Sequence, residues 1–401
     1  MPTLSKARML TTSVLGMIIT IGIARFAYTP MIPEMMEEIG LSESVAGYLA
    51  AANYAGYLSG ALLISFISSL KLKQILFRSG LCGAVITTLL MAFTQNEIIW
   101  YLLRFISGLS SSAGVLLGAG LLMHWLMKHK HQAELGIFFS GLGLGIVITA
   151  LIAELIKDHF SWDQQWLIYG SVGLVLTLPV WRWFPDQSED SIRPATNTSA
   201  QSVSGLFMPV LQTAYFCAGV GYVITATFLV AIAESSDTLR GQGWLIWLVV
   251  GLACAPGCGL WDRFARIYGQ WLALFLAYVL NSVSILLLMI SQELSITLLS
   301  AVIYGGSFIG IVSMTLSMVG RLYPHNPSRP MSRLTFSYGL AQMIAPAIVG
   351  YLAEMNGNYY SGLLMTLLVM TAGIIALLWA MQLAKTTRHH SNQSTTLKGT
   401  P

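Results

Sequence analysis

The sequence consists largely of apolar runs that are each long enough to cross a membrane, separated by short polar connections. A helix needs about 20 apolar residues to cross the hydrocarbon core of a bilayer. The runs lie near residues 9–30, 44–67, 75–94, 97–123, 135–156, 163–184, 207–233, 243–261, 269–290, 294–319, 333–353 and 359–382. Barrel strands are only about 10 residues long and alternate polar with apolar side chains. The pattern therefore predicts an all-α membrane protein with about twelve transmembrane helices.

Composition agrees with a membrane protein and argues against several other classes. Only 9% of the residues are charged, whereas a soluble domain carries roughly 25%. The four cysteines lie inside predicted spans, which argues against a secreted disulfide framework. We interpret Cys254 and Cys258 as small packing residues, and we expect no metal site and no cofactor. The basic KHKH segment at 128–131 is interpreted as a loop, and no nucleic-acid partner is expected.

One long polar interval divides the chain into two halves. Residues 185–206, rich in Ser, Thr, Pro and Asp, are interpreted as a flexible linker between bundles at 1–184 and 207–401. Weak internal similarity supports the division, because GYLAAANYAGYLSG in the first half parallels GWLIWLVVGLACAPG in the second. Two pseudo-symmetric six-helix bundles are expected of a carrier whose halves rock around a central site.

The distribution of basic residues predicts the orientation. Lys and Arg accumulate on the cytoplasmic side of membrane proteins. If the N-terminus is cytoplasmic, 17 of the 21 Lys and Arg residues fall at cytoplasmic ends, and only Lys157 and Arg240 fall at outer ends. We therefore expect a multi-pass protein of the inner membrane with both termini in the cytoplasm.

Short stretches of the chain resemble a known family. GIARFAYTPMIPEM, GVGYVITATF, GLWDRFAR and GLAQMIAP, together with RFISG from Arg104, are similar to recurrent stretches of the YbfB/YjiJ-like branch of the major facilitator superfamily. The resemblance implies the fold of that superfamily and secondary transport by alternating access. It also implies a conformational gate at Asp262, Arg263 and Arg266, which match a D-R-x-x-R motif. The alternative for these three residues is an ordinary basic loop.

Polar side chains recur at helical spacing inside the predicted spans, where they must find partners. Each pair either binds solute or joins neighbouring helices, and both interpretations stay open. The candidate substrate-binding residues are Arg25, Tyr28, Thr29, Asn53, Tyr57, Arg104, Tyr222, Thr225, Tyr304 and Gln342. Glycines 136, 141, 143 and 145, in contrast, are expected to permit close helix packing.

Two arginines, Arg25 and Arg104, lie well inside predicted spans rather than at their ends, and no acidic residue lies at mid-depth to neutralise them. An arginine near a helix centre costs about 2.5 to 3.5 kcal/mol on insertion scales, so function is the default reason to retain it. One interpretation is an electropositive cavity in which Arg25 binds an organic anion. The other has Arg25 reaching Glu34 or Glu154, with Arg104 bonded to carbonyl groups as a packing element.

These observations predict a secondary active transporter of a small organic solute, with an organic anion as one substrate class. No HExxH, GxSxG or P-loop pattern is present, so the chain is not expected to be an enzyme. The alternatives are an efflux carrier for amphipathic or aromatic compounds and a solute-sensing membrane protein without transport. Expected partners are the lipid bilayer, the solute, and either a coupling proton or an exchanged solute, with the protein acting as a monomer.

Overall fold

The computed structural model describes residues 5–129, 131, 135–184, 205–323 and 328–396. All the regular elements among them are helical. The first half contains α1 (Lys6–Met17), η1 (Ile18–Phe26), α2 (Tyr28–Ile39), α3 (Glu43–Ser65), α4 (Leu70–Leu90), η2 (Met91–Phe93), α5 (Glu97–Ser112), η3 (Ala113–Leu117), α6 (Gly118–Lys128), α7 (Leu135–Ile156) and α8 (Trp162–Trp183). The second contains α9 (Phe207–Glu234), α10 (Gly243–Tyr268), α11 (Gln270–Ile290), α12 (Leu294–Leu322), α13 (Ser328–Asn356) and α14 (Tyr360–Thr396). Most of the predicted linker lies outside the described residues.

The predicted membrane architecture is confirmed. Ten helical segments in the described ranges are long and apolar enough to span a membrane, with α1–η1–α2 forming one segment and α5–η3–α6 another. The less apolar helices α3 and α8 have 23 and 22 residues, which is also long enough to cross. Asn96 shows how the sequence starts such a helix, since its side chain accepts the Ile98 N–H at 3.0 Å and so caps α5.

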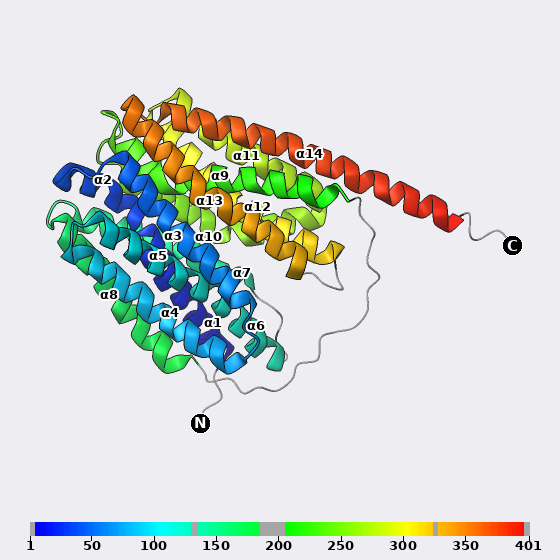
Figure 1. Cartoon of the computed structure of the whole chain (residues 1–401), viewed down its shortest axis with the longest axis horizontal. Helices are drawn as coiled ribbons and strands as arrows, with labels where there is room; N and C mark the ends of the chain where they lie inside the picture. Colours follow the sequence, from blue (N-terminus) through cyan, green and yellow to red (C-terminus); the bar gives the residue numbers. More distant parts are fainter. Residues whose placement is uncertain (1–4, 130, 132–134, 185–204, 324–327, 397–401) are drawn as a thin grey trace.

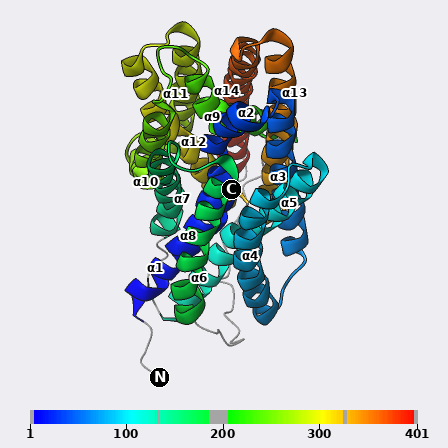
Figure 2. The ribbon, with the colours of Figure 1, turned by 90° about the vertical axis from the view of Figure 1, so that its left-hand side faces the viewer.

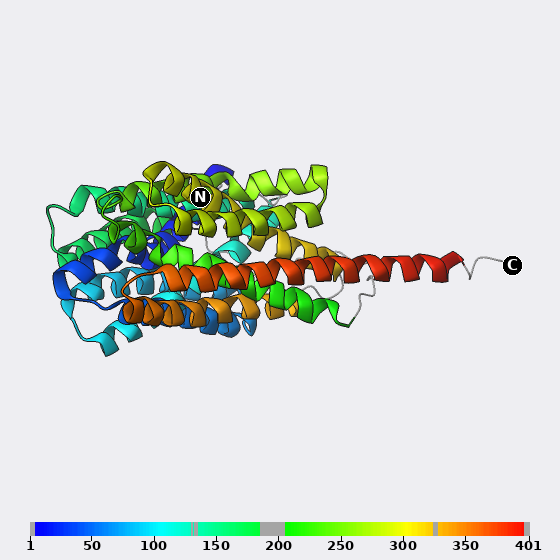
Figure 3. The ribbon, with the colours of Figure 1, turned by 90° about the horizontal axis from the view of Figure 1, so that it is seen from above.

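The helices form two bundles that meet at one end of the molecule and diverge towards the other (Figure 1). We call the meeting end, which carries Glu34, Glu154, Glu234 and Glu354, the acidic end. The opposite end, where α1 begins and α14 ends, is called the basic end. Seen along the bundles, the first half lies below the second (Figure 2), and α14 extends well past its neighbours at the basic end (Figure 3).

The halves touch along two seams, in which α3 packs against α13 and α7 against α10. A Cβ atom at Gly143 would lie 2.5 Å from the backbone nitrogen of Ala255, so only glycine permits this approach of α7 to α10. Within the first half, the same atom at Gly145 would lie 2.6 Å from the Cα of Gly22. The predicted packing role is thus confirmed for these glycines and for Gly141, but Gly136 faces open space.

The first span contains a π-helical stretch, η1, which the sequence did not reveal. Its wider turn is visible where the Ala27 N–H donates to the Gly22 carbonyl at 3.0 Å, five residues back. Because π-helical turns change the register, Gly22 and Arg25 do not share the face that α-helical spacing predicts. Gly22 packs on α7, and Arg25 reaches α3.

Candidate functional site

Arg25 projects from η1 onto polar and aromatic side chains of α3. Its Nε donates to Oδ1 of Asn53 at 3.1 Å, and the guanidinium carbon lies 4.6 Å from the ring centroid of Tyr54 and 4.5 Å from that of Tyr57. The side chain is 8% exposed. A guanidinium between two aromatic faces is stabilised by cation–π attraction, most strongly when water is excluded. This arrangement holds the charge in place without an acidic partner among the described residues.

Asn53 connects the two buried arginines. While its oxygen accepts from Arg25, its amide nitrogen donates to the backbone carbonyl of Arg104 at 3.0 Å. The residue is fully buried. Both ends of its amide are therefore used within the protein, and its role in this conformation is to fix the direction of Arg25.

Arg104, on α5, is used mainly in packing within the first half. Its Nη1 donates to the Ala24 carbonyl at 2.9 Å, and its guanidinium carbon lies 4.4 Å from the ring centroid of Tyr28. Ser107 donates to the same carbonyl at 2.8 Å. This is the contact that the packing interpretation expected for Arg104. Arg25, in contrast, contacts Asn53 and two tyrosines, and its described contacts include neither Glu34 nor Glu154.

Each arginine keeps one buried nitrogen without a hydrogen-bond partner among the described residues, Nη2 in Arg25 and Nε in Arg104. A buried charged donor without an acceptor is costly. An anionic acceptor beside Nη2 would remove this cost for Arg25. Around Arg104, the neighbouring space lined by Trp166 and Ser107 is too small to admit even a water molecule. Arg25 also contacts Tyr54, which meets Tyr222 of the second half, so of the two groups Arg25 is better placed to meet a solute between the halves.

An aromatic cluster continues from Arg25 into the second half, and we define it as Tyr54, Tyr215, Tyr222, Tyr304, Phe308 and Tyr338. Tyr54 meets Tyr222 edge-to-face with centroids 6.5 Å apart, which carries the cluster across from α3 to α9. Tyr222 then lies 5.0 Å from Phe308 and 5.9 Å from Tyr338, nearly parallel to the latter. The cluster places flat apolar surfaces and hydroxyl groups next to the cation.

The other predicted residues are dispersed. Tyr28 donates to the Ala46 carbonyl at 2.9 Å, and Thr29 donates across the halves to the Ala226 carbonyl at 2.7 Å. Thr225 donates within its own helix to Gly221, and Gln342 is buried on α13. Tyr304 donates to the Tyr222 carbonyl at 2.7 Å. The structure therefore joins Arg25, Asn53 and Tyr57 directly, and Asn53 connects them to Arg104 and its neighbour Tyr28. Tyr222 and Tyr304 lie in the aromatic cluster beside this group.

Sequence reasoning missed Tyr54, Tyr215 and Phe308. A usable signal was present, because Tyr215 lies seven residues before Tyr222 and Phe308 lies four residues after Tyr304, so each pair shares a helix face. These rings were indistinguishable from ordinary core residues without knowledge of which faces meet at the seam. No group of three or more His, Cys, Asp and Glu in the described ranges is arranged to hold a metal ion.

The predicted gate residues lie exposed near the basic end of α10. Asp262 pairs with Arg266 at 3.2 Å within the same helix, and Arg263 is also exposed. No hydrogen bond or ion pair of these three residues to the first half is seen in the described part of the chain. Since the halves diverge at this end, a contact between them through the motif would need another conformation, and the gate stays a prediction.

An apolar groove of about 380 Å³ lies beside the α3–α13 seam. It is lined by Tyr48, Ala51, Ala52, Ala55, Tyr101 and Met343. Small alanine side chains on one face of α3 create this space between helices of both halves.

Comparison with known proteins identifies the fold and the family. A crystal structure of a variant of the nucleoside transporter NupG superposes with a TM-score of 0.72 at 13% identity, covering 94% of this chain and 99% of that one. A gallate transporter of Pseudomonas putida is 24% identical over 39% of this chain and 35% of its own length. A benzoate transport protein of Acinetobacter baylyi is 22% identical over 46% of this chain and 41% of its own length.

The chain spans less than half the length of these two curated relatives, so they do not by themselves assign a substrate. A family model covers far more, matching residues 17–378, and its description is uncharacterised MFS-type transporter YbfB. This range includes the whole of the site around Arg25 and nearly all of both bundles. The chain therefore belongs to the YbfB family of MFS-type transporters, a family of membrane transporters rather than enzymes.

Proposed function

We propose that this protein is a secondary active transporter that carries a small organic anion, of the aromatic carboxylate class, across the inner membrane by alternating access. The observation that carries the proposal is the unpartnered Nη2 of buried Arg25, next to the aromatic cluster at the contact between the halves. A planar guanidinium binds a carboxylate through charge-assisted hydrogen bonds. The neighbouring rings offer faces to the apolar part of such a solute.

Charge and similarity support the same class. No acidic side chain contacts the Arg25 guanidinium in the described structure, so a solute carboxylate would meet no competing carboxylate there. Gallate and benzoate, which two relatives are named for, are both aromatic carboxylates. Bundles at 1–184 and 207–401 joined by a linker at 185–206 would move around this site. The basic end, with both termini, would face the cytoplasm.

The test compares an anion with its neutral analogue on the purified protein. Benzoate should raise the melting temperature and enter proteoliposomes saturably, whereas benzamide, which has the same ring without the charge, should do neither. Arg25→Lys should weaken benzoate binding by roughly tenfold or more, since a point charge replaces a planar fork. Arg8→Lys, at an exposed position of α1, is the matched control. Equal stabilisation by benzoate and benzamide would contradict the proposal.

The apolar groove beside the α3–α13 seam favours a second candidate, efflux of amphipathic compounds. Its lining carries no charged side chain, so it suits a neutral or cationic molecule arriving from the bilayer. Ala52→Trp would fill the groove. A loss of amphipathic-dye transport in that variant, with benzoate binding unchanged, would support this candidate over the first.

A further inference from the structure

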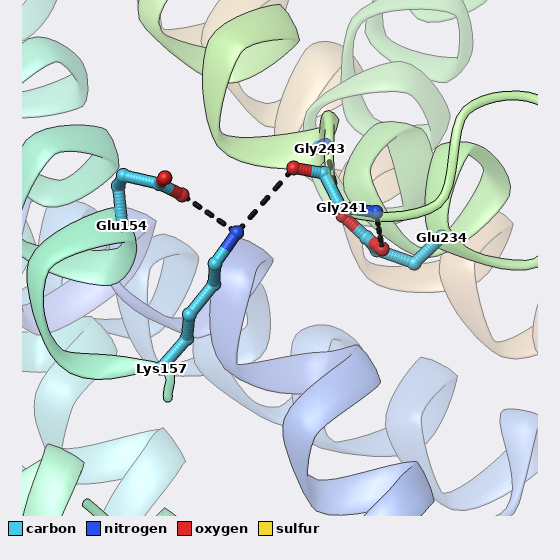
Figure 4. Close-up of polar contacts among 5 residues, drawn as sticks. All are labelled: Glu154, Lys157, Glu234, Gly241 and Gly243. Atoms are coloured by element: carbon cyan, nitrogen blue, oxygen red, sulfur yellow. Dashed lines mark hydrogen bonds and ion pairs between the residues drawn. The ribbon is translucent and has the colours of Figure 1, made fainter. Parts of the chain in front are cut away.

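At the acidic end, one lysine bridges the two halves. Lys157 directly follows α7 in the first half, and its Nζ lies 3.4 Å from the Gly241 carbonyl in the α9–α10 loop of the second half. The same Nζ lies 2.7 Å from Oε2 of Glu154, one turn earlier on α7 (Figure 4). The two charges form an ion pair without a well-directed hydrogen bond. Lys157 thus has one partner in its own half and one across the seam.

The loop that receives Lys157 is held in shape by its own half. Glu234, the last residue of α9, accepts the Gly241 N–H at 2.7 Å and the Gly243 N–H at 2.8 Å (Figure 4). Gly241 adopts a left-handed conformation with φ of +79°, which glycine tolerates without strain. The carboxylate also caps the start of α10, where unpaired N–H groups favour an anion. The Gly241 carbonyl is therefore presented to Lys157 by a preorganised loop.

The equivalent place on the other seam is built differently. There Glu354 of α13 accepts the Ser44 N–H at 3.1 Å, so a carboxylate of the second half reaches the start of α3 directly. On the α7–α10 seam, Glu234 already occupies the start of α10, and the carboxylate facing it, Glu154, acts through Lys157. A hydrogen-bond donor is needed here because the group left for the opposite half to bind is a carbonyl oxygen, and the Lys157 ammonium supplies that donor.

We propose that Lys157 is a latch that joins the halves at the acidic end and must release the Gly241 carbonyl before this end opens. The latch can reform after it opens, because each partner stays in place when the halves separate. Glu154 still pairs with the Lys157 ammonium, and Glu234 still holds the α9–α10 loop in its conformation. Lys157 is 24% exposed, so water replaces the carbonyl at little cost. The inference goes beyond the substrate and rests only on the alternating motion of the proposed function.

The test measures the separation of the halves without any substrate. Spin labels at His159→Cys and Asp237→Cys, both exposed and on opposite sides of the seam, report it after the four native cysteines have been replaced. In nanodiscs, Lys157→Gln should increase the population with long distances about two- to fivefold, as expected for a partly exposed charged contact. Lys157→Arg should retain the native distribution.

Arg240→Gln is the matched control, since it removes the other positive charge of the acidic end from an exposed side chain of the same loop. It should leave the distances unchanged. An unchanged distribution in Lys157→Gln would overturn the latch, as would equal shifts in both variants, which would indicate net charge instead. Failure of benzoate binding would have no bearing on these distances, so the two proposals fail separately.

Discussion

The two halves make the same helix-to-helix contact with different chemistry. In the first half, Arg104 of α5 donates to the Ala24 carbonyl of η1 at 2.9 Å. In the second, Tyr304 of α12 donates to the Tyr222 carbonyl of α9 at 2.7 Å. Residues 104 and 304, like 24 and 222, are separated by about half of the chain. A hydrogen bond thus recurs at corresponding places in the two halves, while its donor carries a positive charge only in the first.

This difference indicates that the two halves would contribute different groups to a bound solute. Among the described residues, the first half holds both buried arginines, whereas the second half contributes most rings of the aromatic cluster. A solute bound between them would have its charge fixed by one half and its apolar body by the other. Such a solute would touch both halves, so its affinity would depend on how the halves are arranged, and binding would then shift that arrangement.

The largest effect is expected when the second half receives an arginine at the position that corresponds to Arg104 in the first half. Tyr304→Arg would place a cation at a position that is 1% exposed. With no compensating acid, the loss of stability should be about 3 to 5 kcal/mol, as for other unpaired buried charges. Folded yield in detergent and the melting temperature would report it. A stable variant would show that the second half also accommodates a cation, which would remove the contrast between the halves.

The next prediction separates the two arginines. Arg25→Gln should lower benzoate affinity by roughly tenfold or more, since a charge-assisted contact is worth about 1.5 to 3 kcal/mol, and should change the melting temperature little. Arg104→Gln should show the reverse, a lower melting temperature with the preference for benzoate over benzamide retained. Calorimetric binding together with thermal unfolding measures both quantities. Identical profiles for the two variants would argue against distinct roles.

A smaller effect is expected at Asn53. Asn53→Asp would neutralise Arg25 and lose the donor to the Arg104 carbonyl, so benzoate affinity should fall by about tenfold. Asn53→Ala frees Arg25 and should reduce affinity less, by misdirecting the guanidinium. Titration of both variants with benzoate ranks them. The opposite ranking would mean that Asn53 contacts the solute rather than positioning Arg25.

Tyr304→Phe gives the smallest change. It removes one hydrogen bond and leaves the Tyr222 carbonyl without that donor, at a cost of about 1 kcal/mol. Ring packing against Phe308, at 5.2 Å, is preserved. A small drop in melting temperature with unchanged benzoate affinity is expected. A large loss of affinity would instead assign the Tyr304 hydroxyl to the binding site.

The fold could be predicted from the sequence because each membrane helix requires a long apolar run, which is easily recognised. The site was only partly predictable. Arg25 and Arg104 stood out as charges in an apolar setting. Their different contacts, however, depend on the hydrogen bond from Arg104 to the Ala24 carbonyl and on the π-helical register of η1, and neither can be predicted from residue spacing. The aromatic cluster escaped prediction because it forms from helices far apart in the sequence. The contact from Lys157 to Gly241 was equally hidden, since it joins two loops.

The bare guanidinium nitrogen of Arg25 has an electrical consequence. An elementary charge that crosses a membrane potential of 100 mV changes energy by about 2.3 kcal/mol. If the Arg25 charge moves through part of the membrane potential when the empty protein changes conformation, the equilibrium between its conformations depends on voltage. Once a monovalent anion sits beside the guanidinium, the pair is nearly neutral and the response weakens. Voltage should therefore act mainly on the return step of the unloaded protein.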